Sequence, residues 1–121
     1  AEIISGMNIL NVNDMIIAAR RILKLGPKNV LIKGGHLKNN YLFDVLINKK
    51  FLKIYKNKKI KSRNTHGTGC TLSSAIATYY SCGKDIKSSC YLAIKYVNDA
   101  IRTAPNYGKG NGPINHLNNR K

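Results

Sequence analysis

The chain has 121 residues, of which 43% are hydrophobic and 21% charged, so it can bury the core of one domain and is not a disordered basic tail. Lys and Arg outnumber Asp and Glu by 21 to 5, which gives a net charge of +16. No apolar run reaches the length of about 18 residues that a membrane-spanning helix needs, and residues 1–10 lack the basic and small-residue signals of a signal peptide. Because the first residue is Ala rather than Met, we expect a processed chain or a piece of a longer one.

The excess of positive charge first suggests nucleic acid as a partner. Lys, Asn and Ile, however, account for 46 of the 121 residues, and all three have A/T-rich codons, so drift in composition explains the same charge. The densest basic stretch, residues 49–63, alternates lysines with Phe51, Ile54 and Tyr55, as a strand pair with one solvated face would. A solvated hairpin is therefore the first hypothesis here. A nucleic-acid patch and general attraction of an anionic substrate are the alternatives.

The three cysteines, Cys70, Cys82 and Cys90, are odd in number and include no CxxC pair. This pattern does not predict a disulfide framework and indicates a cytoplasmic protein. His66 and Cys70 are four residues apart, but no second pair of ligands follows them, so we expect no zinc site.

The first half of the chain predicts one helix followed by several strands. Apolar residues recur at helical spacing from Met15 to Leu23, with Asn13 as the expected cap and Gly26-Pro27 as the stop. The wholly apolar run 30–32 is typical of a strand buried on both faces in a parallel sheet. Further strands are expected at residues 41–47 and 51–55, and a weaker one around Ile60.

The second half predicts two helices and a tail. The first begins at Thr71, is expected to stop at Gly83, and carries one apolar face made of Leu72, Ala75, Ile76, Tyr79 and Tyr80. The second helix runs from Ile86 to Ile101. The tail, residues 106–121, is rich in Gly and Asn and is expected to form loops. This order favours an α/β fold, in which the first helix should follow a strand, so we expect a strand upstream of residue 1.

The segment most informative about chemistry is residues 65–75, in which a Gly67-Thr68-Gly69 turn leads directly into a helix. Glycines let the backbone turn sharply, and the helix N-terminus adds unpaired N–H groups and a positive dipole end, which together favour phosphate. Cys70 falls in the first helical turn, where a thiolate is stabilised and can act as a nucleophile or general base. The alternative is an ordinary helix start with a small buried cysteine.

Residues 66–77 (HGTGCTLSSAIA) closely resemble the anion-hole signature of the hydroxymethylpyrimidine/phosphomethylpyrimidine kinases of thiamine biosynthesis, members of the ribokinase-like superfamily. Residues 26–36, 44–46 and 108–116 resemble further segments of that family in the same order, so the resemblance covers essentially the whole chain. Most members of the wider superfamily have Asp at the position of Cys70. With a cysteine there, this sequence resembles the pyrimidine-kinase branch of the superfamily.

The resemblance implies an α/β fold, namely the C-terminal part of a ribokinase-like three-layer α/β/α sandwich. Family members are longer than this chain, so residues 1–121 would form a single partial domain, the C-terminal half of the kinase domain. The family's tendency to dimerise also makes a homodimer an expectation.

The resemblance further implies a role for each matching residue. Gly67, Thr68, Gly69 and the Cys70 amide would hold the transferring phosphoryl group, and Cys70 would be the catalytic base. Lys33, with Gly34 and Gly35, would reach the phosphates of ATP, and the reaction would need Mg²⁺, for which no residue is assigned as a ligand. His36 and His66 are expected to form hydrogen bonds within loops, and His116 has no assigned role.

The implied function is ATP-dependent phosphorylation of hydroxymethylpyrimidine and its monophosphate. The expected partners are therefore ATP and a small pyrimidine, not a membrane or a nucleic acid. Three alternatives remain: a vitamin B6 (pyridoxal-type) kinase with the same fold and anion hole, a basic nucleic-acid-binding domain, and an inactive remnant.

Overall fold

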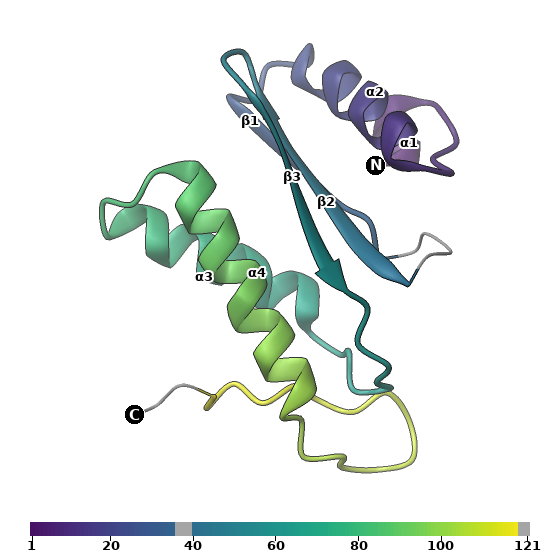
Figure 1. The fold of residues 1–121 in the computed structure, drawn as a ribbon, viewed down its shortest axis with the longest axis vertical. Coiled ribbons are helices and arrows are strands. Elements are labelled where there is room, and N and C mark those ends of the chain that lie inside the picture. Colours follow the sequence, from purple (N-terminus) through teal and green to yellow (C-terminus); the bar gives the residue numbers. More distant parts are fainter. Residues whose placement is uncertain (36–39, 119–121) are drawn as a thin grey trace. The chain divides into compact units, whose positions relative to one another are not determined.

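The computed structural model describes residues 1–35 and 40–118. Its elements follow in the order α1 (Glu2–Ser5), α2 (Val12–Leu23), β1 (Asn29–Lys33), β2 (Tyr41–Asn48), β3 (Leu52–Lys58), α3 (Thr68–Ser81) and α4 (Ile86–Arg102) (Figure 1). They form two compact units, Ala1–Lys59 and Ile60–Lys121. Within the described ranges, no helix is both long enough and apolar enough to cross a membrane. The prediction that residues 1–121 form one partial domain stays a prediction.

Helix α2 begins two residues earlier than the sequence predicted. Its N-cap is Asn11, whose Oδ1 accepts a 2.9 Å hydrogen bond from the Asp14 backbone N–H, while Asp14 Oδ2 accepts one of 3.0 Å from the N–H of Leu10. These reciprocal bonds satisfy two backbone donors at the helix start. The expected cap, Asn13, therefore lies inside the helix, and that prediction was wrong.

The three strands form an antiparallel sheet in the order β1-β2-β3. The expectation that residues 30–32 are buried on both faces in a parallel sheet was wrong for this sheet. Val30 and Ile32 are buried and Leu31 is half-buried, so the strand alternates between two environments. The reason lies in the connection: residues 34–40 are too few for a parallel crossover, which needs about a dozen residues or more.

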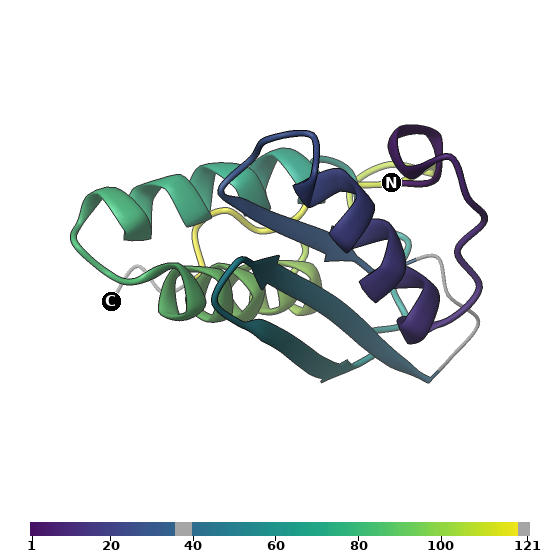
Figure 2. The ribbon, with the colours of Figure 1, turned by 90° about the horizontal axis from the view of Figure 1, so that it is seen from above.

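The core of the first unit lies between α2 and one face of the sheet. Val30 pairs with Ile47 and Ile32 with Val45, which places the four side chains on the same face. They pack against the buried face of α2, and the cluster comprises Met15, Ala18, Ala19, Val30, Ile32, Val45 and Ile47. Figure 2 shows α2 lying along this sheet. The side chains that alternate along the strands and those at helical spacing along α2 thus pack together in one apolar layer.

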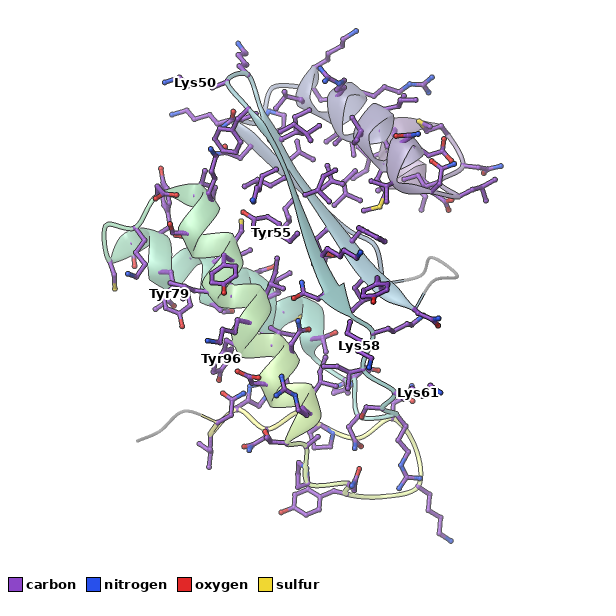
Figure 3. The ribbon with its side chains drawn as sticks, viewed as in Figure 1. Lys50, Tyr55, Lys58, Lys61, Tyr79 and Tyr96 are labelled. Carbon is purple, nitrogen blue, oxygen red and sulfur yellow. The ribbon has the colours of Figure 1, made fainter. Side chains whose placement is uncertain are left out.

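The basic stretch supplies the turn and the second strand, β3, of a hairpin whose first strand, β2, precedes the stretch, so residues 49–63 form only part of the predicted hairpin. Asn48 organises its turn, because Asn48 Oδ1 accepts hydrogen bonds from the backbone N–H groups of Lys50 and Phe51 at 2.8 and 2.9 Å. Along β3 only Tyr55 is buried, while the lysines are exposed (Figure 3). The strand expected around Ile60 is absent from the described residues, since β3 ends at Lys58.

The second unit is built on the pair α3 and α4, which lie side by side (Figures 1 and 2). Asp85 caps α4, because its Oδ1 accepts a 2.9 Å hydrogen bond from the Ser88 N–H. Helix α3 ends as predicted, with Gly83 in the left-handed region at φ 87°. The buried apolar side chains of this unit are Leu72, Cys90, Ala93, Ile94, Val97, Ala100 and Ile114. Tyr80, expected on the packed face of α3, is instead exposed.

Candidate active site

The Gly-Thr-Gly turn is the N-terminus of α3. Gly67 is the N-cap residue and has φ 81°, in the left-handed region that glycine tolerates without strain, and the helix begins at Thr68. The Thr71 hydroxyl donates to the Gly67 carbonyl at 2.8 Å, and the Ser73 hydroxyl donates to the Gly69 carbonyl at 3.1 Å. The carbonyl groups of the turn are therefore satisfied by the helix itself.

The backbone N–H groups of the turn are differently placed. Those of Gly69 and Cys70 have no protein acceptor among the described residues, whereas the N–H of Thr68 donates to the Thr65 carbonyl at 3.4 Å. A Cβ at Gly69 would meet no other atom within 4 Å, so the space beside this residue is open. Unpaired amides at the positive end of a helix, here one of 14 residues, are the kind of group that can bind an anion.

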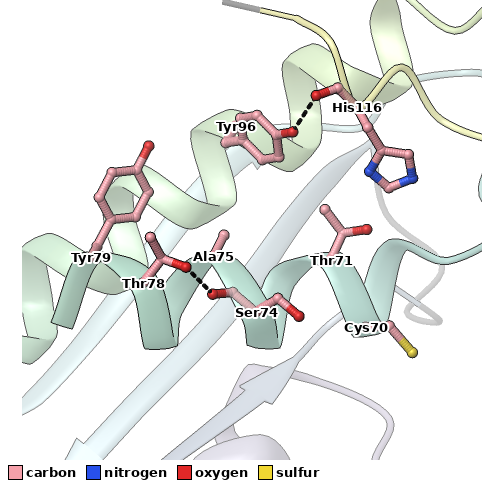
Figure 4. A pocket seen from close by; sticks show the side chains of 8 residues that line it. All are labelled: Cys70, Thr71, Ser74, Ala75, Thr78, Tyr79, Tyr96 and His116. Atoms are coloured by element: carbon pink, nitrogen blue, oxygen red, sulfur yellow. Dashed lines mark hydrogen bonds between the residues drawn. The ribbon is translucent and has the colours of Figure 1, made fainter. Parts of the chain in front are cut away.

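Cys70 occupies the first turn of α3, and its side chain is exposed. Figure 4 shows its Sγ pointing away from the ring of His116. The alternative of a small buried helix-start cysteine was wrong for this position, whereas Cys90, within α4, is buried with 1% of its surface exposed. The thiol of Cys70 is thus accessible to a substrate at the same turn that carries the unpaired amides.

A pocket of about 490 Å³ begins at Cys70 and extends along α3 (Figure 4). Helix α4 contributes Tyr96, whose hydroxyl donates a 2.7 Å hydrogen bond to the carbonyl of His116 in the tail. The remaining lining residues come from α3, and the full set is Cys70, Thr71, Ser74, Ala75, Thr78, Tyr79, Tyr96 and His116. The sequence did not point to Tyr79, Tyr96 or His116 as site residues. The one available signal was that 71, 74, 75 and 78 share a helical face with Cys70.

Lys33, Gly34 and Gly35 lie in the first unit, after β1. Lys33 is exposed at the end of the strand, and Gly34 is buried. A Cβ at Gly34 would collide with the carbonyl oxygen of Phe43, so only glycine fits there. The N–H of Gly34 donates to Asp44 Oδ1 at 3.1 Å, which fixes the start of the loop.

Asp44, which accepts this hydrogen bond, lies on β2 and has 5% of its surface exposed. Burial raises its pKa above the ordinary value, and the hydrogen bond from Gly34 and the charge of Lys33 oppose that rise. The Asp44 carboxyl group therefore holds the backbone at Gly34, although its burial disfavours the charged form of the carboxyl group.

The predicted site residues thus form two groups in different units: Lys33 to Gly35 in the first, and Gly67 to Cys70 in the second. His36 lies outside the described residues. His66 is exposed, and its backbone N–H donates to the Gly112 carbonyl at 3.3 Å. The loop role expected for its ring stays a prediction.

A family model described as phosphomethylpyrimidine kinase matches residues 1–115 of the chain. The chain belongs to the phosphomethylpyrimidine kinase family. The family predicted from the HGTGC segment is confirmed.

Curated relatives in this family match nearly the whole chain. The chain is 44% identical over 117 residues to the thiamine biosynthesis bifunctional protein ThiED of Geobacter sulfurreducens, covering 97% of the chain and 24% of that protein. It is 41% identical over 110 residues to the hydroxymethylpyrimidine/phosphomethylpyrimidine kinase of Aquifex aeolicus, covering 91% of the chain and 43% of that kinase. The chain thus spans less than half the length of these relatives, as the expected correspondence to one half of a kinase requires.

Solved structures of the same fold include two pyridoxal kinases. An ADP complex of Bacillus subtilis pyridoxal kinase matches with a TM-score of 0.90 and 33% identity, covering 96% of the chain and 46% of that kinase. An ADP complex of Staphylococcus aureus pyridoxal kinase matches with a TM-score of 0.90 and 28% identity, over 96% of the chain and 44% of that kinase. The predicted α/β fold of the ribokinase-like kind is confirmed.

Proposed function

We propose that this phosphomethylpyrimidine kinase segment is the C-terminal part of an enzyme that transfers the γ-phosphoryl group of ATP to hydroxymethylpyrimidine and then to its monophosphate. The observation that carries the proposal is the pair of unpaired amides, Gly69 and Cys70, at the start of α3 behind a left-handed Gly67. A helix N-terminus with free N–H groups favours the charge that spreads over a phosphoryl group in transfer.

In this proposal the turn residues Gly67, Thr68, Gly69 and Cys70 form the anion hole. The unpaired N–H groups of Gly69 and Cys70 donate to oxygens of the migrating phosphoryl group, and the glycines leave room for it. The Thr68 N–H already donates to Thr65, at the long distance of 3.4 Å, so it has to exchange that acceptor for the phosphate or contribute little.

Cys70 is the proposed base. In this role its exposed sulfur takes the proton from the hydroxymethyl oxygen as that oxygen forms a bond to the γ-phosphorus, and the bond from phosphorus to the β-bridging oxygen breaks to release ADP. In the second phosphorylation the acceptor is an oxygen of the existing phosphate. Cys70 therefore has two proposed roles. Its backbone N–H binds an oxygen of the phosphoryl group, and its side chain takes the proton from the acceptor.

The pocket along α3 is the proposed place of the nucleotide base. Tyr79 and Tyr96 offer aromatic faces in a mostly apolar wall that starts at the anion hole, which fits a planar base attached to phosphates. The solved pyridoxal kinases that contain ADP support nucleotide binding by this fold. Lys33, with Gly34 and Gly35, is proposed to contact the phosphates of ATP.

Mg²⁺ would enter with ATP and neutralise phosphate charge when bound. The described residues contain no group of three or more His, Cys, Asp or Glu side chains that could hold a metal ion. Near α3, Asp85 is engaged in capping α4 and Asp99 pairs with Arg102. We therefore assign no ligand of this cation among the described residues.

A vitamin B6 kinase is the second candidate, because both solved structures described above are pyridoxal kinases at 28% and 33% identity. The homodimer and the cytoplasmic location stay predictions.

Transfer of phosphate from ATP to each alcohol tests the proposal. The intact enzyme that contains this chain should phosphorylate hydroxymethylpyrimidine with a higher kcat/KM than pyridoxal. The reverse preference would favour the B6 kinase, and absence of both nucleotide binding and transfer would exclude both candidates.

A further inference from the structure

The tail after α4 returns to the segment that precedes the anion-hole turn. Arg63 Nη2 donates to the Gly108 carbonyl at 3.2 Å, and the His66 N–H donates to the Gly112 carbonyl at 3.3 Å. His66 and Pro113 also form an isolated parallel β-bridge. Two separate points of the tail thus hold residues 63 and 66, immediately before Gly67.

Asn64 lies between these two points and is 2% exposed. Its Nδ2 donates a hydrogen bond to Asn106 Oδ1, and its backbone N–H donates to the Ser62 hydroxyl at 3.0 Å. Asn106 has φ 57°, a left-handed conformation that is uncommon outside glycine. The side chain of Asn64 therefore connects the pre-turn segment to a left-handed corner of the tail.

Gly112 completes this arrangement because it has no side chain. A Cβ at this position would collide with Asn64 Oδ1 and would lie 3.1 Å from the Tyr107 carbonyl oxygen. Gly110, in the same loop, is different, since a Cβ there would meet no atom within 4 Å. Of these two glycines, only Gly112 has to lack a side chain for the Asn64 side chain to fit.

Stability alone does not explain the buried amide. Asn64 Oδ1 has no hydrogen-bond partner among the described residues, and an unpaired buried acceptor costs about 1–3 kcal/mol. Such a group in a native fold calls for another explanation. The place of Asn64 in the chain offers that explanation. Asn64 precedes Thr65, whose carbonyl accepts the Thr68 N–H at the start of the turn.

We propose that Asn64 is a positioning residue: with Asn106 and Gly112 it clamps the tail to residues 63–66 and so fixes the direction of the anion-hole amides. The inference rests on the proposed function, because it gives the clamp a role in binding phosphate. The clamp holds both neighbours of Thr65, and Thr65 in turn holds Thr68 at the start of α3.

The test compares Gly112→Ala with the matched control Gly110→Ala in the full chain. Amide exchange at His66, Thr68 and Thr71 and the shifts of the Gly69 and Cys70 amides are followed by NMR during titration with inorganic phosphate. Gly112→Ala should weaken phosphate binding about tenfold and speed exchange at His66 and Thr68, while Gly110→Ala changes neither.

A second variant covers the outcome in which Gly112→Ala does not fold. Asn64→Asp keeps the shape of the side chain but cannot donate to Asn106 Oδ1, and it should loosen the same amides. In the double variant Asn64→Asp/Gly112→Ala the effects should fall short of additive, because both act on one contact. Equal exchange and equal phosphate binding in all variants would overturn the clamp.

The outcome also separates the clamp from the function on which it rests. If the unaltered chain binds no phosphate but Gly112→Ala still speeds exchange at Thr68, the clamp stands and the anion hole is refuted. If phosphate binds equally well to the unaltered chain and to Gly112→Ala, the anion hole stands and the clamp is refuted.

Discussion

Gly34 donates its backbone N–H to Asp44 Oδ1 over 3.1 Å, and the carbonyl oxygen of the preceding residue on that strand, Phe43, lies where a side chain of Gly34 would be. The loop after β1 is therefore held against β2 by one hydrogen bond and one steric contact. Both are local to the first unit, and both affect the backbone that carries Lys33.

The first prediction concerns the pH dependence of stability through Asp44. Because burial raises the pKa of Asp44 in the folded chain, the folded state holds the proton more tightly than the unfolded state. The contribution of this group to the free energy of unfolding is therefore full below the unfolded value of about 4 and is lost as pH rises through the folded pKa.

Asp44→Asn removes the titration and keeps an oxygen that can accept from Gly34. Urea unfolding across this pH range should show a smaller decline in stability for Asp44→Asn than for the unaltered chain. Asp44→Ala, which leaves the Gly34 N–H unpaired, should be about 1–3 kcal/mol less stable than Asp44→Asn at every pH. Identical pH profiles for the unaltered chain and Asp44→Asn would refute the assignment.

The second prediction uses the two glycines of the loop. Gly34→Ala should destabilise the first unit by about 1–3 kcal/mol, since its Cβ would collide with backbone that cannot move without breaking the sheet. Gly35→Ala is the matched control, because a Cβ there meets no atom within 4 Å. Thermal unfolding measures the difference, and equal melting temperatures would contradict the steric account.

The third prediction concerns Cys70. In the intact enzyme that contains this chain, Cys70→Ala should lower kcat by about 10²–10⁴ and leave the affinity for ATP nearly unchanged, because Cys70 is the proposed base. Cys82→Ala is the control, since Cys82 is also exposed but lies at the other end of α3, at the C-cap. Steady-state kinetics with ATP distinguish the two, and turnover that survives Cys70→Ala rules out this base.

The fourth prediction concerns the pocket along α3. Tyr79 lines it, whereas the next residue, Tyr80, is exposed and is not among the lining residues. Loss of an aromatic face against a nucleotide base costs about tenfold in affinity, so Tyr79→Ala should raise the Kd for ADP by that factor. Calorimetric titration of Tyr79→Ala and Tyr80→Ala should give different affinities. Matching values would place the base elsewhere.

Local patterns in the sequence predicted α3, α4 and the basic hairpin, because helical spacing, Gly83 and the Asn-Lys turn each act within a few residues. The N-cap of α2 was missed because Asn11 and Asn13 are both good caps, and the choice depends on the bond between Asp14 and Leu10. The strand direction was predictable in principle from the short connection 34–40, but the apolar run 30–32 suggested otherwise.

At the candidate site, the turn at Gly67 and the first-turn place of Cys70 could be predicted because both follow from neighbouring residues. The pocket could not, since Tyr96 and His116 reach it from α4 and the tail. The seat of Asn64 was missed for the same reason: nothing near position 64 indicates that Gly112, 48 residues later, leaves space for its amide.

The two edges of the sheet differ in character. Along β3, lysines at 53, 56 and 58 line the edge, and charged side chains of this kind discourage pairing with another strand. The outer edge of β1 carries Val30, Leu31 and Ile32 without a charge until Lys33. A strand that extended this sheet would therefore meet no charged side chain along residues 30–32 of β1, but three lysines along β3.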